Sequence, residues 1–390
     1  MISVAEVRLH RTTVPLVRPF VTAVRTATEI EALLVEVVDS DGRSGWGEAP
    51  TSWRVTGESP ASVTAAVEGP LRDAVLGLPV AEPEAASLAL ERAVVRNSAA
   101  RMAVDCAIYD LAAQAAGVPL HLLLAGADRA TTGGGAAGGA GSAAPTLAAA
   151  GTEVRTDMTL SAAVSAADIR ALVETAVAHR DAGFRTLKIK MGAGGDDVAT
   201  MVAVRDAVGP DITLRADANQ GWTPRQAVKV IREWEDRGLA VQLVEQPVHR
   251  DDLEGLAFVT ANVDIPVLAD ESVWTTRDAR EVIARRAADM VNIKLAKTGG
   301  PREALALLDV AAGSGVSAIV GCMMESHVGI AAAAAVAAVV DARAGGATAH
   351  DLDAGLWLSA SPVLGGIRYE GEMVLVPAAP GLGIRGLSRD

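Results

Sequence analysis

The chain has 390 residues, of which 50% are hydrophobic and 21% charged, and its net charge is −13 with a pI of about 5.0. This composition indicates a globular protein, and the acidic balance argues against nucleic acid or an anionic membrane surface as the main partner. Its two cysteines, Cys106 and Cys322, give no disulfide framework, which favours a cytoplasmic protein. The alanine-rich apolar stretch 329–340 is too short to span a membrane.

Residues 1–128 have the pattern of an α+β domain. Polar and apolar residues alternate over 3–14 and 29–49, which predicts antiparallel strands, and "DSDGRSG" at 39–45 predicts a hairpin turn. Helical patterns follow at 61–76 and 97–117, the second ending at a glycine.

A Gly/Ala-rich stretch, 129–153, follows this domain. Gly133, Gly135 and Gly138 match G-x-G-x-x-G by spacing, but that motif indicates a dinucleotide site only between a strand and a helix. No clear strand precedes these glycines, so we interpret 129–153 as a linker.

Residues 154–358 repeat one unit, in which a short apolar strand is followed by a helix. Eight such strands, with helices between most of them, predict an α/β fold: a modified (β/α)8 TIM-type barrel with the N-terminal domain as an appendage. The C-terminal segment 359–390 has strand and turn signals without a helix, and we expect it to return to the N-terminal domain.

Charged residues close successive strands of the barrel at intervals of 24 to 31 residues. They are Lys190, Asp217, Glu245, Asp270, Lys294, Glu325 and Asp351. Because the C-terminal ends of barrel strands surround one mouth, where catalytic groups lie, we expect all seven to converge.

Asp217, Glu245 and Asp270 come from three consecutive strands. Three carboxylates brought together repel one another unless a cation neutralises them. A ligand set of oxygen atoms alone favours a hard divalent ion, Mg²⁺ first and Mn²⁺ second. Any one of these residues taken alone has a simpler interpretation, as a helix N-cap or a solvated loop residue.

Lys188 and Lys190 lie in "TLKIKMG" and share one face of a strand. Lys294 lies across the mouth, on the sixth strand. A desolvated lysine beside other cations has a lowered pKa and acts as a base near neutral pH; the alternative is that the lysines only pair with the carboxylates. A base on each face of a carbon α to a carboxylate permits 1,1-proton transfer, which is racemisation or epimerisation.

Five motifs in this order, "TLKIKMG", "LRADANQGW", "LVEQPV", "LADES" and "VNIKLAKTGG", resemble the muconate-lactonizing subgroup of the enolase superfamily. Within it the chain resembles the dipeptide epimerases, close to the L-Ala-D/L-Glu epimerases. The resemblance extends over nearly the whole chain, with "RPFVTAVRT" and "GWGEAPTSWRVTGES" in the first domain. It implies a modified barrel, an α+β capping domain and one Mg²⁺ per subunit.

The resemblance also implies roles for individual residues. Asp217, Glu245 and Asp270 match the metal ligands, Lys190 and Lys294 the acid/base pair, Lys188 their helper, and Asn219 and Glu271 the neighbours of the ligands. In "HDLDAG", Asp351 and Asp353 match the pair that holds the substrate's α-ammonium group, and strand alternation would place both on one face. Arg25 matches the arginine that binds a glutamyl carboxylate. The alternatives are a helix N-cap or turn for the aspartates and a solvated arginine for Arg25.

Strand seven departs from the pattern and leaves substrate preference open. Met323, Met324 and Glu325 are expected to shape the pocket, since methionines adapt to several shapes. We expect His327 to be a surface or helix-start residue and Cys322 to be a small buried apolar residue.

The sequence therefore predicts a Mg²⁺-dependent dipeptide epimerase for a small-molecule substrate such as Ala-Glu, an activity that would fit recycling of cell-wall peptides. The close alternative is a sister reaction: N-acylamino acid racemase, o-succinylbenzoate synthase or muconate cycloisomerase. A non-catalytic metal- or ligand-binding relative is a further alternative, against which both lysines and all three carboxylates argue. The oligomeric state is open, and the apolar helices allow a homo-oligomer.

Overall fold

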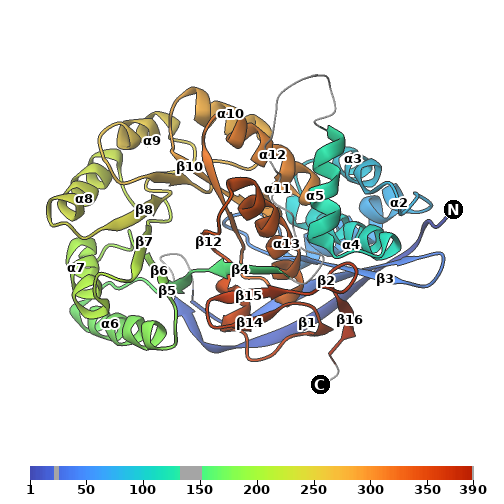
Figure 1. Ribbon diagram of the computed structural model, residues 1–390, viewed down its shortest axis with the longest axis horizontal. Helices are drawn as coiled ribbons and strands as arrows, with labels where there is room; N and C mark the ends of the chain where they lie inside the picture. The colour runs from blue at the N-terminus through green and yellow to red at the C-terminus, as the bar shows by residue number, and fades with distance from the viewer. Residues whose placement is uncertain (22–25, 132–151, 389–390) are drawn as a thin grey trace.

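The computed structural model describes residues 1–21, 26–131 and 152–388 (Figure 1). The N-terminal part begins with a three-stranded antiparallel sheet of β1 (Val4–Val21), β2 (Thr26–Asp39) and β3 (Ser44–Ala49), in that order. The predicted turn between β2 and β3 is present. The Asp39 carboxylate accepts hydrogen bonds from the backbone N–H groups of Asp41 and Arg43, and Gly42 has a φ of 83°. Such a φ strains any residue with a Cβ, which accounts for the glycine.

Helices cover this sheet. They are α1 (Pro60–Ala66), the π-helical turn η1 (Val67–Leu71), α2 (Arg72–Val75), α3 (Pro83–Ala93), α4 (Ser98–Ala116) and α5 (Leu120–Thr131). The predicted helix 97–117 is confirmed as α4, which is buried along most of its length. A Cβ on Gly45 or Gly47 of β3 would lie 2.1 Å from the carbonyl oxygen of Ala107 or 2.0 Å from that of Ala103. Glycine therefore lets α4 approach the strand closely.

The barrel sheet confirms the predicted fold class. It contains seven parallel strands in the order β11-β10-β9-β8-β7-β6-β5. The strands are β5 (Met158–Leu160), β6 (Thr186–Lys190), β7 (Thr213–Asp217), β8 (Val241–Glu245), β9 (Val267–Ala269), β10 (Met290–Lys294) and β11 (Ser317–Gly321). The eighth strand, β12 (Ala349–His350), pairs with β4 (Thr152–Thr156), and the adjoining Asp351 bridges to Gly321.

Helices follow the barrel strands, and those after β5 to β9 lie on the outside (Figure 1). They are α6 (Ala166–Asp181), α7 (Asp197–Val208), α8 (Pro224–Asp236), α9 (Leu253–Thr260), α10 (Thr276–Ala284), α11 (Leu295–Thr298), α12 (Pro301–Gly313) and α13 (His327–Ala344). The eighth strand is followed instead by a short 3₁₀ helix, η2 (Asp353–Trp357). This last unit is where the barrel departs from a regular (β/α)8 pattern.

Helix α13 carries the alanine-rich stretch and extends it to 18 residues. Among the described helices it alone has the length and apolar composition to cross a membrane, and 72% of it is buried inside the protein. Its residues from Val328 to Val340 are all buried. Such burial is what a core helix requires, and the alanines let neighbouring elements pack close to it.

The C-terminal segment forms β13 (Val363–Gly365), β14 (Arg368–Glu370), β15 (Met373–Val376) and β16 (Ile384–Leu387). Strand β15 pairs antiparallel with β4, next to the barrel. Gly381 exchanges backbone hydrogen bonds with Val118 and Leu120 of the N-terminal part. The segment therefore contacts both parts of the molecule.

The limits of the predicted linker 129–153 are wrong at both ends, because α5 continues to Thr131 and β4 begins at Thr152. Gly133, Gly135 and Gly138 lie outside the described residues.

Candidate active site

The strand-end residues lie at one end of the barrel sheet. Lys190, Asp217, Glu245 and Lys294 are the last residues of β6, β7, β8 and β10, and Asp270 and Asp351 directly follow β9 and β12. Glu325 differs: β11 ends at Gly321, so the expectation that Glu325 closes a strand is wrong. Three neighbouring strands, β7, β8 and β9, separate the strand of Lys190 from that of Lys294.

Asp217 and Glu245 are aligned in register on adjacent strands, and both are buried. Asp217 accepts hydrogen bonds from the Lys190 ammonium at 2.5 Å and from the Asn219 backbone N–H at 2.9 Å. Glu245 Oε1 accepts from the Asn292 side-chain amide at 2.8 Å. Its Oε2 has no hydrogen-bond partner, although it is fully buried. Burial, and then the charge of Asp217, raises the pKa of Glu245.

Asp270 is held by two lysines. The Lys294 ammonium donates to Oδ2 at 2.8 Å, and the Lys297 ammonium donates to Oδ1 at 2.6 Å. Burial opposes ionisation, but the two ammonium groups outweigh it and lower the pKa of Asp270. The backbone N–H of Asp270 donates to Gln246 Oε1 at 2.9 Å. All the polar atoms of Asp270 thus have partners.

These three carboxylates fit a divalent cation. Their donors are all oxygen, they lie at three adjacent strand ends, and the buried Oε2 of Glu245 has no hydrogen-bond partner, with the Lys188 ammonium 3.5 Å away. Asp217, Glu245 and Asp270 would hold the ion, which would stabilise negative charge developing on a bound substrate.

The lysines pair with carboxylates more strongly than we expected. Lys188, which is 2% exposed, lies 2.6 Å from Asp351 Oδ1 and 3.5 Å from Glu245 Oε2. Burial alone would lower the pKa values of Lys188 and Lys294, but the surrounding carboxylates raise both well above the ordinary value. The expectation of a lowered pKa is therefore wrong for Lys294 within the protein alone, because it faces several carboxylates, whereas Lys188 was expected to remain a cation.

Asp351 and Asp353 come together, although not by strand alternation. β12 ends at His350, and Asp353 already begins η2. One carboxylate oxygen from each of Asp351, Asp353 and Asp157 nevertheless lies within 4.8 Å of the other two. Asp353 accepts from the Thr159 backbone N–H at 2.6 Å. Burial, and then the charge of Asp351, raises the pKa of Asp353 to about 6.

Asp157, Asp351 and Asp353 are thus close enough to share a cation, and among the described residues Asp217, Glu245 and Asp270 do not approach one another as closely. Within this cluster, Lys188 pairs with Asp351, and Arg215 lies 3.0 Å from Asp157 Oδ2. Asp217, Glu245 and Asp270 remain the predicted metal ligands, with the buried Glu245 Oε2 free of hydrogen bonds.

The two predicted neighbours of the metal ligands lie close to them in sequence: Asn219 is two residues after Asp217, and Glu271 directly follows Asp270. Asn219 has a φ of 44°, which turns its backbone N–H back onto Asp217. Glu271 is buried with an unpartnered Oε2, and burial followed by the charge of Asp270 raises its pKa to about 8. Arg25 lies outside the described residues.

The loop after β11 carries the remaining predicted residues. Glu325 is buried, and its Oε1 accepts from the Met323 backbone N–H at 2.8 Å. Burial, and then Glu48, raises the pKa of Glu325 to about 8. Met323 and Met324 are partly buried against the core. His327 is the first residue of α13, with its ring against Tyr369, and Cys322 is buried and free.

Sequence reasoning missed several polar residues at this site. Asn292 and Arg215 lie two residues before Lys294 and Asp217, so strand alternation would have placed them on the same inward face. Gln246 directly follows Glu245, and Lys297 lies three residues after Lys294. No alternation of polar and apolar residues marks either position. Glu48 of β3 accepts hydrogen bonds from the Ser326 and Gly329 backbone N–H groups at the start of α13, a contact between domains that no local pattern predicts.

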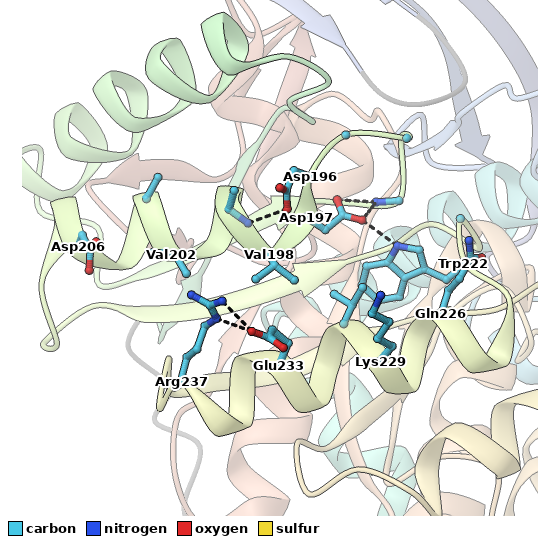
Figure 2. A pocket seen from close by; sticks show the side chains of 17 residues that line it. Asp196, Asp197, Val198, Val202, Asp206, Trp222, Gln226, Lys229, Glu233 and Arg237 are labelled. Atoms are coloured by element: carbon cyan, nitrogen blue, oxygen red, sulfur yellow. Dashed lines mark hydrogen bonds and ion pairs between the residues drawn. The ribbon is translucent and has the colours of Figure 1, made fainter.

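A further cavity lies away from this mouth. A groove of about 1030 Å³ lies between α7 and α8 on the outside of the barrel (Figure 2). At one end, Trp222 Nε1 donates to Asp197, and at the other Arg237 pairs with Glu233. None of the predicted metal ligands or lysines lines it, so the groove is separate from the site of the proposed chemistry.

Known proteins resemble the chain over its full length. Residues 4–125 match the N-terminal domain of the mandelate racemase / muconate lactonizing enzyme family, and residues 171–387 match the enolase C-terminal domain-like family. An L-Ala-D/L-Glu epimerase of Bacillus subtilis is 40% identical over 98% of this chain and 97% of its own length. A solved substrate-liganded structure of the L-Ala-D/L-Glu epimerase from that organism superposes with a TM-score of 0.88, covering 99% of this chain and 100% of that one.

Two further relatives differ in their substrates. A dipeptide epimerase of Enterococcus faecalis, solved with Mg and the dipeptide L-Leu-L-Tyr, is 34% identical over 98% of this chain and 99% of that one, with a TM-score of 0.85. An N-succinyl Arg/Lys racemase of Bacillus cereus is 26% identical with a TM-score of 0.85, over 98% of this chain and 95% of that one. The chain therefore belongs to the mandelate racemase and muconate lactonizing enzyme family of the enolase superfamily, among the relatives of the dipeptide epimerases.

Proposed function

We propose that the protein is a Mg²⁺-dependent dipeptide epimerase that inverts the α-carbon of the C-terminal residue of a dipeptide such as L-Ala-D/L-Glu. The observation that carries this proposal is the placement of Lys190 on β6 and Lys294 on β10, on either side of the three carboxylates of β7, β8 and β9. Two bases on opposite sides of one carboxylate-binding centre suit removal of a proton from one face and its return to the other.

Each group has a part in the reaction. Asp217, Glu245 and Asp270 would hold the ion, which would supply electrostatic stabilisation for negative charge on the substrate carboxylate. Lys190 and Lys294 move the α-proton. Lys188 keeps a positive charge beside Asp351 and Glu245 in the floor of the site. Most of these groups are buried, so little bulk water competes with them.

Asp351 and Asp353 support a substrate with a free ammonium group. Two buried carboxylates close together favour a cationic ligand, and an N-acylated substrate offers none. The named activities of the Bacillus subtilis and Enterococcus faecalis relatives support a dipeptide. The Bacillus cereus racemase marks the alternative, a racemase of N-acylated amino acids.

A comparison of free and N-acetylated Ala-Glu tests this choice. Replacing Asp353 by Asn removes one anionic partner of the substrate ammonium, while its carbonyl can still accept from Thr159. We expect kcat/KM for the free dipeptide to fall roughly 10- to 100-fold and that for the N-acetylated dipeptide to change little. Asp206→Asn, an exposed aspartate on α7, is the control and should behave as wild type. Equal losses on both substrates would contradict the amine-binding role and favour the racemase.

We also propose where the protein acts, in which process, with which other ion and in what assembly. A cytoplasmic location is consistent with two free, buried cysteines, and a part in recycling cell-wall peptides follows from an Ala-Glu substrate. Mn²⁺ in place of Mg²⁺ rests on the oxygen-only ligand set. A homo-oligomer rests only on the apolar helices of the sequence.

A further inference from the structure

Lys297 is a fully buried lysine that has no role in the reaction proposed above. It lies on α11, the short helix that directly follows Lys294, and its side chain is 0% exposed. Its ammonium group donates three hydrogen bonds: to Asp270 Oδ1 at 2.6 Å, to the Asp270 backbone oxygen at 2.5 Å, and to the Asn292 backbone oxygen at 2.9 Å. An ammonium group has three protons, so this one is saturated by protein oxygens.

These bonds tie two of the proposed metal ligands together. The backbone oxygen of Asn292 accepts from Lys297, and its side-chain amide donates to Glu245 Oε1 at 2.8 Å. On the other side, the Gln246 side chain accepts from the Asp270 backbone N–H. Lys297 thus holds the main chain and one carboxylate oxygen of Asp270 at the same time, which prevents the carboxylate from rotating about its side-chain bonds.

The same contacts divide the two oxygens of Asp270. Oδ1 accepts a hydrogen bond from Lys297, whose fully buried side chain cannot turn towards solvent. Oδ2 faces Lys294, a residue at the mouth. A metal ion near Lys294 at the mouth therefore meets Oδ2, while Oδ1 is already engaged by the buried Lys297.

We propose that Lys297 is a positioning residue that enforces one-oxygen binding of Asp270 and so favours Mg²⁺ over Ca²⁺. Mg²⁺ demands near-ideal octahedral geometry from fixed single oxygens, whereas Ca²⁺ accepts six to eight oxygens and readily takes both oxygens of a carboxylate. The inference rests on the proposed function in one respect, that Asp217, Glu245 and Asp270 hold the ion.

The test is the binding of Mg²⁺ and, separately, of Ca²⁺ to the full chain by titration calorimetry after treatment with a chelator. Lys297→Met removes the ammonium group and leaves Asp270 free to turn. We expect the Mg²⁺ affinity to fall about 10- to 100-fold, and the Ca²⁺ affinity to fall by a clearly smaller factor, so that the preference for Mg²⁺ shrinks. Lys229→Met makes the same exchange at an exposed position on α8 and should bind both ions as wild type does.

Lys297→Gln keeps a donor for Asp270 Oδ1 without the charge, and it decides the question if Lys297→Met does not fold. We expect it to retain most of the preference for Mg²⁺. An unchanged Mg²⁺/Ca²⁺ preference in the folded Lys297 variants, or an equal loss of both affinities, would overturn the role proposed for Lys297. A wild-type protein that binds no Mg²⁺ would instead overturn the proposed function, and the inference with it.

Discussion

At the scale of single residues, charge compensation explains the site. Lys188, Lys190 and Lys294 each pair with a different carboxylate: Asp351, Asp217 and Asp270. Buried charges persist only when they are paired, so lysines and carboxylates at this mouth require one another. Each of these lysines therefore lies next to a carboxylate that is also a proposed partner of the metal ion or of the substrate ammonium group.

Replacing either proposed base tests the two-base account. In Lys190→Ala and Lys294→Ala we expect epimerisation to fall by about 10² to 10⁴, the usual contribution of a positioned acid or base. Each variant should exchange the α-proton of at most one of the two epimers, because one base remains. Proton NMR of both epimers in D₂O measures this, with Lys229→Ala as control and circular dichroism to show folding. Full activity in both variants would exclude the mechanism.

At the scale of elements, close approach between β3 and α4 depends on glycine. Gly47→Ala would place a Cβ 2.0 Å from the Ala103 carbonyl oxygen, a backbone atom that cannot move without shifting α4. We expect the free energy of unfolding, measured with urea, to fall by about 1–3 kcal/mol. Gly126→Ala is the control: it lies in α5 with open space around its Cβ, and it should be neutral or slightly stabilising. Equal stability of both variants would show that the contact is not tight.

The helices and strands also show which parts of the site could be predicted from the sequence. Strands β6, β7, β8 and β10 end at the charged residues that the spacing indicated, because a repeated βα unit fixes where each strand stops. The last unit was harder to predict. Asp351 and Asp353 meet through the turn into η2 and through Thr159 of β5, a contact between the two ends of the barrel that periodicity does not contain. Lys297 was missed for a similar reason, since its partners depend on how α11 folds back under Asp270.

At the scale of the whole molecule, buried acids join the two parts. Glu48 of β3 binds the start of α13, and Asp105 of α4 lies against Gly300 at the start of α12, where a Cβ would be 2.0 Å from its Oδ2. Asp105 also accepts a hydrogen bond from Ser87 at 2.5 Å. Burial raises the pKa of Asp105 to about 7, against the opposing effects of Ser87 and Arg101. The folded protein therefore favours its neutral form.

This shift predicts how stability changes with pH. Because the pKa of Asp105 is raised from 3.8 to about 7 in the folded state, its contribution is full at low pH and is lost as pH rises through that window. Asp105→Asn cannot ionise, so its melting temperature relative to wild type should increase between pH 5 and pH 8. Melting curves at both pH values measure this, with the exposed Asp73→Asn as control. A pH-independent difference would contradict the assignment.

The central claim is that Lys190 and Lys294 exchange the α-proton of a dipeptide beside a bound Mg²⁺. The most direct measurement is incubation of a dipeptide library with the protein and Mg²⁺ in D₂O, with α-deuterium read by mass spectrometry. We expect L-Ala-L-Glu or a similar free dipeptide to gain one α-deuterium and to appear as both epimers, and a chelator to stop both changes. Absence of exchange in every dipeptide, with exchange in N-acylated amino acids instead, would contradict it.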